Sequence, residues 1–288
     1  MTHPETFKQA LEQSLRSSNA AAELVRERQR LIFDRLLARI VAVFGDAVTL
    51  KGGLALWMRL ARARATRNID LHLRGAPADL LPKLQRAGRT HLGDFLTFEI
   101  WPDDDHPNET PYDGIRFRAE CKLAGKLYGQ PFGVGITFDE PMLGEPEVVV
   151  AQDVLAFAGI APPTLKLYPI ETHIAEKLHA YTMPRARPSA RVKDLPDILL
   201  LASVRKLEGN RLYTAFEQTF AFRDTHPLPG SIPRAPEAWS GPYEAMARED
   251  QLPWETLFDV HVSALSFLDP VLARGRDLIW LPNKSRWE

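Results

Sequence analysis

Two glycines stand between a short apolar run and a helical stretch within residues 47–73, and an alternating stretch follows them. The apolar run "AVTL" leads into "KGG", and "LALWMRLARARA" then shows apolar residues at helical spacing. In "NIDLHL" three polar side chains alternate with three apolar ones, the period of a β-strand with one face in a core. The segment therefore predicts strand, glycine turn, helix and strand. The polar face of the second strand is either solvated or the floor of a site.

The rest of the chain divides into a mixed N-terminal half and a helical C-terminal half. Residues 5–44 have apolar side chains at helical spacing, and residues 95–138 alternate as strands of a probable hairpin. Helical patterns return after "EPEVVV", and a stretch rich in proline at 226–242 precedes a last helix. We expect an α+β protein, with an α/β core over residues 1–150 and a helical region over residues 151–288.

Composition and charge narrow the classes of function. The chain has 288 residues, 45% of them hydrophobic, which suffices for a substantial core. Its net charge of −1 gives no global basic field, so any nucleic-acid surface must be local. The single cysteine, Cys121, excludes an internal disulfide framework and a cysteine-based zinc site. No apolar run is long enough for a membrane span, and we expect a cytoplasmic protein.

The glycine turn and the polar strand could together bind a nucleotide. Gly52 and Gly53 allow close approach of a phosphate, and the following helix offers free N–H groups. Asp70 lies on the strand face with Asn68 and His72 beside it, where a Mg²⁺ ion could bridge the protein to a triphosphate. Taken separately, each feature is equally explained by an ordinary turn and a solvated sheet face.

Two later helical segments carry further charged residues. Lys177 lies in "AEKLHA", off the apolar side of its predicted helix. Asp194 and Asp197 lie in "KDLPD", three residues apart and hence on one helical face. The plain explanation is one exposed lysine and an acidic helix start.

The order of these motifs resembles the AbiEii/MenT-type toxins, a family of DNA-polymerase-β-like nucleotidyltransferases from bacterial toxin–antitoxin pairs. The resemblance rests on "KGGLALWMRLARARATRNIDLHL", "YPIETHIAEKLHA" and "ARVKDLPDILLL", and spans roughly residues 45–205. It implies a polymerase-β-like mixed sheet with flanking helices in the N-terminal half. It also implies a Mg²⁺-dependent enzyme that uses an NTP, together with a cognate antitoxin protein as partner.

The resemblance also implies roles for individual residues. Asp70, Lys177 and Asp194 are the expected catalytic residues, and Asp70 and Asn68 are the expected ligands of Mg²⁺. The residues expected to bind the nucleotide are Lys51, Gly52, Gly53, Arg67, Asn68 and Lys177. Further candidates are His72, Asp197, Arg191 and Lys193.

The sequence departs from the family pattern at three positions. Leu54 follows the glycines where a serine or threonine is common, and Asn68 replaces the first carboxylate of the strand motif. Gly135 occupies the place on a later strand where we expect a third acidic residue. A two-metal mechanism needs two or three carboxylates, so a degenerate, non-catalytic nucleotide- or RNA-binding protein is the first alternative.

Relatives with this pattern transfer nucleotides to the 3′ end of tRNA and so block translation. We therefore expect an RNA acceptor, and specifically a tRNA acceptor stem. Two groups of basic residues fit this expectation, because they flank the proposed site and would bind phosphates locally. They are Arg59, Arg62 and Arg64 before the strand, and Arg185 and Arg187 before Asp194. A second alternative is a nucleotidyltransferase that acts on a protein or a small molecule.

Overall fold

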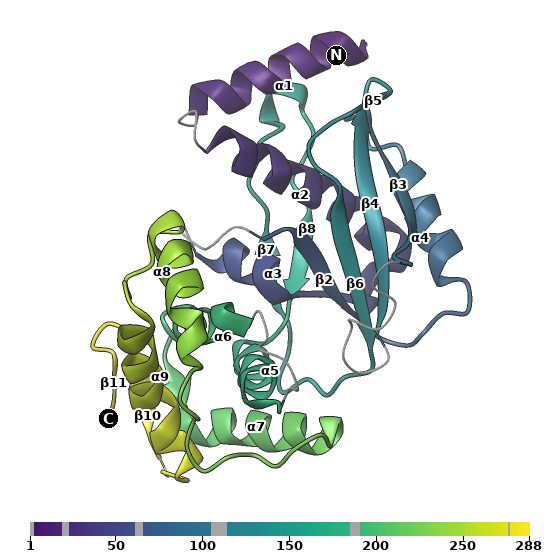
Figure 1. The fold of residues 1–288 in the computed structure, drawn as a ribbon. Coiled ribbons are helices and arrows are strands. Elements are labelled where there is room, and N and C mark those ends of the chain that lie inside the picture. The colour runs from purple at the N-terminus through teal and green to yellow at the C-terminus, as the bar shows by residue number, and fades with distance from the viewer. Residues whose placement is uncertain (1–2, 19–22, 61–65, 105–113, 185–190, 276) are drawn as a thin grey trace. The chain divides into compact units, whose positions relative to one another are not determined.

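The computed structural model describes residues 3–18, 23–60, 66–104, 114–184, 191–275 and 277–288 (Figure 1). The chain divides into two compact units. Unit 1 comprises Met1–Leu54, Ala65–Asp139 and Pro146–Leu167, and unit 2 comprises Ala55–Arg64, Glu140–Glu145 and Tyr168–Glu288. The expected boundary at residue 150 thus falls within unit 1. Among the described helices, none is long and apolar enough to cross a membrane.

Unit 1 contains the main sheet, which is mixed as expected. Its strands are β1 (Val48–Lys51), β2 (Asn68–Leu73), β3 (Leu96–Pro102), β4 (Ile115–Leu123), β5 (Lys126–Leu127), β6 (Phe132–Phe138), β7 (Glu147–Val150) and β8 (Thr164–Leu167). They are ordered β3-β4-β6-β2-β1-β8-β7, with β5 paired to β4. The pairs β2–β6 and β1–β8 are parallel and the others are antiparallel.

Helices of unit 1 cover the apolar face of this sheet. The helices are α1 (Pro4–Ser18), α2 (Leu24–Phe44) and α4 (Leu80–Arg89), with short 3-10 turns at Gly45–Ala47 and Ala156–Ala158. Phe33 of α2 packs edge-on against Phe132 of β6, at 4.9 Å between ring centroids. Gly88 of α4 lies against the backbone of Phe98 in β3. Figure 1 shows α2 and α4 behind the strands, so the polar side chains of β2 lie on the opposite face.

A buried ion network fixes α2 to the sheet. Asp94 is fully buried and accepts hydrogen bonds from Arg35 at 2.7 Å and from Arg39 at 2.9 Å. Arg39 also donates to the carbonyl of Leu96 at 2.7 Å. Buried charges are tolerated when they are paired and hydrogen-bonded in this way. The network therefore explains how charged residues of α2 stay in the core.

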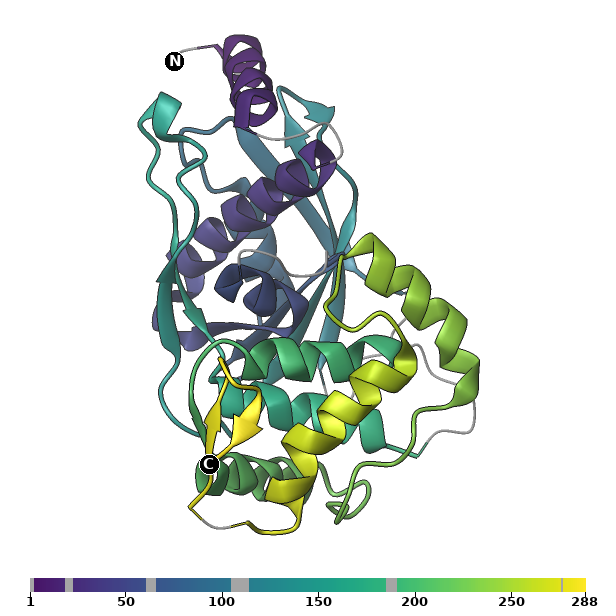
Figure 2. The same ribbon diagram turned by 90° about the vertical axis from the view of Figure 1, so that its left-hand side faces the viewer.

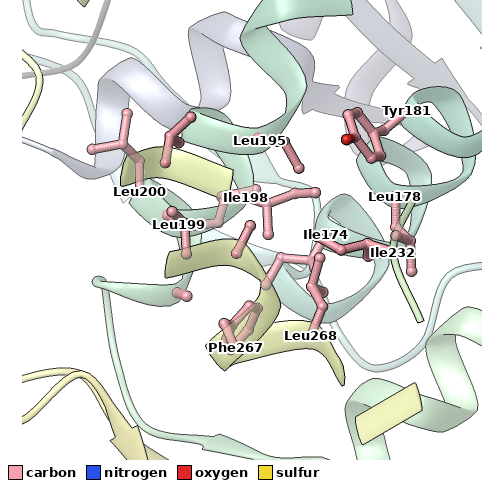
Figure 3. Packing of buried hydrophobic residues seen from close by; sticks show 14 of the residues in the cluster. Ile174, Leu178, Tyr181, Leu195, Ile198, Leu199, Leu200, Ile232, Phe267 and Leu268 are labelled. Carbon is pink, nitrogen blue, oxygen red and sulfur yellow. The ribbon is translucent and has the colours of Figure 1, made fainter. Parts of the chain in front are cut away.

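Unit 2 is mainly helical, as expected for the C-terminal half (Figure 2). Its elements are α5 (Ile170–Thr182), α6 (Asp194–Ala202), α7 (Gly209–Arg223), α8 (Ser240–Glu249), α9 (Leu257–Leu272), and 3-10 turns at Arg191–Lys193 and Glu237–Trp239. Helix α3 (Gly52–Arg59) begins in unit 1 and ends in unit 2. The core of unit 2 joins α5, α6 and α9, with Ile174, Ile198 and Leu268 all fully buried (Figure 3).

The structure differs from the sequence-based expectation in two local features. The helix expected over residues 5–44 is instead two helices, α1 and α2. A small sheet that was not expected is formed by β9 (Leu207–Glu208), β10 (Ile279–Leu281) and β11 (Arg286–Trp287), with β10 in the middle. Strands of two or three residues are too short to show a period. Trp280 and Trp287 hold this sheet against α9 by packing on Phe267.

Candidate functional site

The polar face of the main sheet is built on the central strands β1, β2 and β6. Lys51 of β1 lies opposite Asp70 of β2, and Asp70 lies opposite Gly135 of β6. Opposed residues of neighbouring strands point to the same face. Asn68 is likewise opposite Gly133. The apolar residues of β2 point to the covered face and are buried, whereas Asn68 and Asp70 are half-buried.

Gly52 brings the turn after β1 directly against the Asp70 carboxylate. Its backbone has φ +68°, which favours glycine, and a Cβ atom added there would lie 2.2 Å from Oδ2 of Asp70. Helix α3 begins at Gly52, so its free N–H groups start beside this carboxylate. The glycine turn and the acidic strand, which are 18 residues apart in sequence, thus form one local cluster within unit 1.

The glycines of β6 leave room for the polar side chains of β2. A Cβ atom at Gly133 would lie 2.8 Å from Oδ1 of Asn68, and one at Gly135 would lie 3.1 Å from Oδ1 of Asp70. The position where we expected a third acidic residue is therefore adjacent to Asp70, and it carries no side chain. Asp139 does not replace it, because its Oδ1 accepts a hydrogen bond from the N–H of Gly75 at 2.8 Å.

Two residues of the polar face, His72 and Lys51, are buried. His72 is only 5% exposed and lies opposite Thr49 of β1 and Thr137 of β6. Lys51 is 8% exposed, and its ammonium donates to Oγ1 of Thr137 at 3.3 Å. The solvated-face explanation is thus wrong for His72 and Lys51. Asn68 and Asp70 are the side chains of this β2 face that remain partly accessible.

Lys177 forms a second charged cluster with two carboxylates inside unit 2. Its Nζ lies 2.7 Å from Oδ2 of Asp197 and 3.3 Å from Oδ1 of Asp194. Both carboxylates are fully buried, and the lysine side chain is 12% exposed. The expected acidic helix start is confirmed, because both aspartates lie in the first turn of α6, but they make no side-chain cap and are buried, and the lysine is not exposed. Arg191 adds a longer contact, 3.9 Å from its Nε to Asp194.

The other candidate residues have varied surroundings. Lys193 is the residue before α6 and makes no side-chain cap. Arg59 donates to the backbone carbonyl of Tyr168 at 2.6 Å, a contact within unit 2 that holds the segment before α5. Arg67 is exposed at the start of β2. The remaining candidates, Arg62, Arg64, Arg185 and Arg187, lie outside the described residues.

Two arginines of β4 belong to the polar face but were missed from the sequence. Arg116 lies opposite Gly135, and Arg118 lies opposite Gly133 on one side and Trp101 of β3 on the other. The alternation of "IRFRAECKL" showed that these arginines share one face of a strand. The pattern of a single strand does not show which strands lie beside it in the sheet, so it could not predict that β4 pairs with β6.

The donor set on this face fits one divalent ion better than two. Within the described residues, no group of three or more histidine, cysteine, aspartate or glutamate side chains could hold a metal. Asp70 and Asn68 nevertheless offer a carboxylate and an amide oxygen on adjacent positions of one strand face. Mg²⁺ is commonly held by one or two carboxylates, with substrate phosphates and water completing its shell.

Two solved structures are similar to this chain over most of its length. Among solved structures, MenT4, a nucleotidyltransferase toxin from Mycobacterium tuberculosis, aligns with a TM-score of 0.57 and 15% identity, covering 93% of this chain and 99% of that one. The crystal structure of JHP933 from Helicobacter pylori aligns with a TM-score of 0.49 and 18% identity, covering 85% and 94%. At this identity, the likeness to MenT4 shows a common fold.

The family comparison is the more specific one. No curated protein sequence matches this chain. The family described as nucleotidyl transferase AbiEii toxin, type IV toxin–antitoxin system, matches residues 35–260, which include both charged clusters. Because this match spans most of the sequence, the resemblance seen in the sequence motifs is confirmed, and the chain belongs to the AbiEii nucleotidyltransferase toxin family.

Proposed function

We propose that this nucleotidyltransferase toxin transfers a nucleotide from an NTP to the 3′ end of an RNA, a tRNA acceptor stem, and thereby blocks translation. The observation that carries the proposal is the contact of the Gly52 turn with Asp70. It joins a glycine turn, a helix start and a half-buried carboxylate in one place, and a turn of this kind can bind a phosphate. The expected RNA target comes from the family resemblance, and the antitoxin partner comes from the same source.

In the proposed reaction the 3′ hydroxyl oxygen of the RNA attacks the α-phosphorus of the NTP. The bond from that phosphorus to the bridging oxygen breaks, and pyrophosphate leaves with this electron pair. The hydroxyl proton passes to a carboxylate. Asp70 is the better candidate for this contact, because Asp194 is fully buried in unit 2. Catalysis then consists mostly of positioning and charge stabilisation.

The residues of the sheet face would share the binding of the nucleotide. The N–H groups at the start of α3, beginning with Gly52 and Gly53, would donate to phosphate oxygens. The Asp70 carboxylate and the Asn68 amide oxygen would hold Mg²⁺, which neutralises charge on the triphosphate when it is bound. Arg67, exposed at the start of β2, would add a cation for the phosphates.

Lys177 is proposed to contact the triphosphate, as the family resemblance implies. Asp194 and Asp197 fix its ammonium through contacts at 3.3 and 2.7 Å, so they are proposed to position it rather than to touch the substrate. A lysine held between two carboxylates loses little rotamer entropy on binding a further anion. The activity is then expected to fall when Asp197 becomes Asn, even though NTP can still bind.

The test is transfer of label from an α-labelled NTP to total RNA in the presence of Mg²⁺. We expect labelled RNA with the native chain and a loss of label with Asp70→Asn. The control Asp79→Asn removes an exposed carboxylate that is paired with Lys83 on α4, and it should transfer label at the native rate. Equal labelling by the native chain and Asp70→Asn would refute the assignment of Asp70.

A non-catalytic, nucleotide-binding protein is the second candidate, and Gly135 favours it. With glycine opposite Asp70, the described strand face offers one carboxylate where two-metal enzymes use two or three. This candidate predicts NTP binding by calorimetry and no transfer by the native chain. Label that appears in protein or in a small molecule instead of RNA would favour the other alternative, a different acceptor.

A further inference from the structure

The sheet face extends from Asn68 and Asp70 across β6 to β4 and β3, where Arg118 and Trp101 have no role in the proposed nucleotide site. We propose that Arg118 and Trp101 form a platform for the single-stranded 3′ end of the RNA acceptor. This inference rests on the proposed function, because it names residues that would bind the acceptor of that reaction. We call Asn68, Gly133, Arg118 and Trp101 the platform row.

The register of the strands defines the platform row. Asn68 of β2 lies opposite Gly133 of β6, Gly133 lies opposite Arg118 of β4, and Arg118 lies opposite Trp101 of β3. Four adjacent strands thus place these residues side by side on one face. With about 4.8 Å between strands, the row spans about 14 Å from Asn68 to Trp101. Asp70 and Arg116 lie in the neighbouring row, on either side of Gly135.

The glycines of β6 bring no side chain of their own to this face. The side chains of Asn68 and Asp70 lean over Gly133 and Gly135 from β2, so the accessible part of the row is at Arg118 and Trp101. The described helices α2 and α4 pack on the opposite face of the sheet, where Phe98 and Phe132 are buried. Trp101 points to the polar face and is 39% exposed, whereas Phe98 and Ile100 of the same strand point to the covered face and are buried.

Arg118 is the charged residue of the platform row. Further along β4, the Lys122 ammonium is paired with Glu99 at 2.6 Å and with Glu120 at 3.5 Å, which leaves no net positive charge there. Arg118 is different, because no carboxylate of the described residues lies within ion-pair distance of it. A guanidinium that no carboxylate of the described residues neutralises, next to an exposed indole, is the combination that binds a phosphate and stacks on a base.

The position of the platform row indicates which part of the acceptor it would hold. Asp70 marks the point of transfer, so the 3′ hydroxyl must reach it. A strand whose terminal residue lies at Asp70 and whose preceding nucleotides run along the platform row would meet Arg118 and then Trp101. Arginine contacts with phosphate add affinity that depends on salt, and stacking on tryptophan adds affinity that tolerates any base. The platform therefore predicts little sequence preference in the penultimate nucleotides.

The experiment measures binding of a fluorescent single-stranded RNA oligonucleotide by anisotropy at several salt concentrations. Arg118→Ala should weaken binding about tenfold and flatten the salt dependence by about 0.7 units of slope, the value for one phosphate contact of a single strand. Trp101→Ala should also weaken binding about tenfold, and Trp101→Phe should restore most of it, because phenylalanine keeps a stacking face. The control Arg86→Ala removes an exposed arginine of α4, which packs on the other face, and should bind as the native chain does.

The outcomes separate this inference from the proposed reaction. Asp70→Asn should bind the oligonucleotide as the native chain does while it transfers no label. Native affinity in both Arg118→Ala and Trp101→Ala, equal losses in those variants and in Arg86→Ala, or no binding by the native chain would each overturn the platform. A native chain that binds the oligonucleotide through the platform but labels no RNA would refute the proposed function alone. Thermal unfolding of each variant checks that it is folded.

Discussion

The contact between Gly52 and Asp70 can be tested by the smallest possible change, Gly52→Ala. The added Cβ would meet Oδ2 of Asp70 at 2.2 Å, whereas ordinary contact begins at 3.4 Å, so the carboxylate must retreat by about 1.2 Å. The backbone adds a separate cost of roughly 1–2 kcal/mol, since a residue with a Cβ is strained at φ +68°. The displacement of about 1 Å is expected to lower the transfer rate about 100-fold.

Gly159→Ala is the matched control for this change. Gly159 has φ +67° in the left-handed region, and no atom lies within 4 Å of an added Cβ. It should therefore show the same backbone cost of roughly 1–2 kcal/mol and no loss of activity. Urea unfolding measures the first effect, and label transfer to RNA measures the second. Native activity in Gly52→Ala, or equal loss of activity in both variants, would refute the argument that the turn positions Asp70.

Three further predictions concern stability. Burial raises the pKa of Asp34 from 3.8 to about 7, so the free energy of unfolding should fall by about 4 kcal/mol as the pH rises from about 4 to 7. Asp34→Asn should remove this dependence in urea unfolding at a series of pH values, and an unchanged slope would contradict it. Lys177→Met removes the ammonium that pairs with two buried carboxylates, so the free energy of unfolding should fall by about 3–5 kcal/mol. Arg191→Ala removes only a longer contact and should lower it much less, so similar melting temperatures for the two variants would count against the pairing. Thr256→Ala removes the capping box of α9 and should cost about 1 kcal/mol in chemical unfolding, with no change expected in activity.

The sign of the Asp34 effect follows from which state binds the proton. Its carboxyl group is 3% exposed, and in the folded chain it holds its proton up to a pH of about 7, whereas in the unfolded chain it releases the proton near pH 3.8. Between these values the folded state binds more protons, so stability decreases with rising pH. Stability from this group is therefore full below about pH 4 and lost above about pH 7.

Local patterns were enough to predict the strand, the turn and the helix around Asp70. The period of "NIDLHL" gave β2 its two faces, and the glycine pair marked the start of α3 within two residues. The mixed α/β character of the chain was also predictable, because the spacing of apolar residues and the positions of glycine and proline can be read from short segments. The charged cluster at Lys177 was predictable only as a set of residues, and its burial was not.

Contacts across the sheet could not be predicted from such patterns. Arg116 and Arg118 share a face with Asp70 because β4 pairs with β6, and β6 pairs with β2. That order joins residues 48 positions apart, and its cause is the packing of α2 and α4 against the whole apolar face. A one-residue slip of β4 would move both arginines to the covered face. The arginines are therefore fixed by the register that Phe117 and Ala119 impose from the buried side.

The same register explains why Gly135 is tolerated where an acidic residue is expected. A second carboxylate opposite Asp70 would face it at close range on a half-buried surface, where repulsion is costly unless a cation is bound. Glycine removes that repulsion and lets Asp70 lean toward β4, where Arg116 carries the opposite charge. This chain thus has a glycine and a nearby arginine where a further carboxylate was expected. In the reaction proposed above, one Mg²⁺ ion would arrive with the triphosphate, and the phosphates would supply the oxygens that the missing carboxylate does not give.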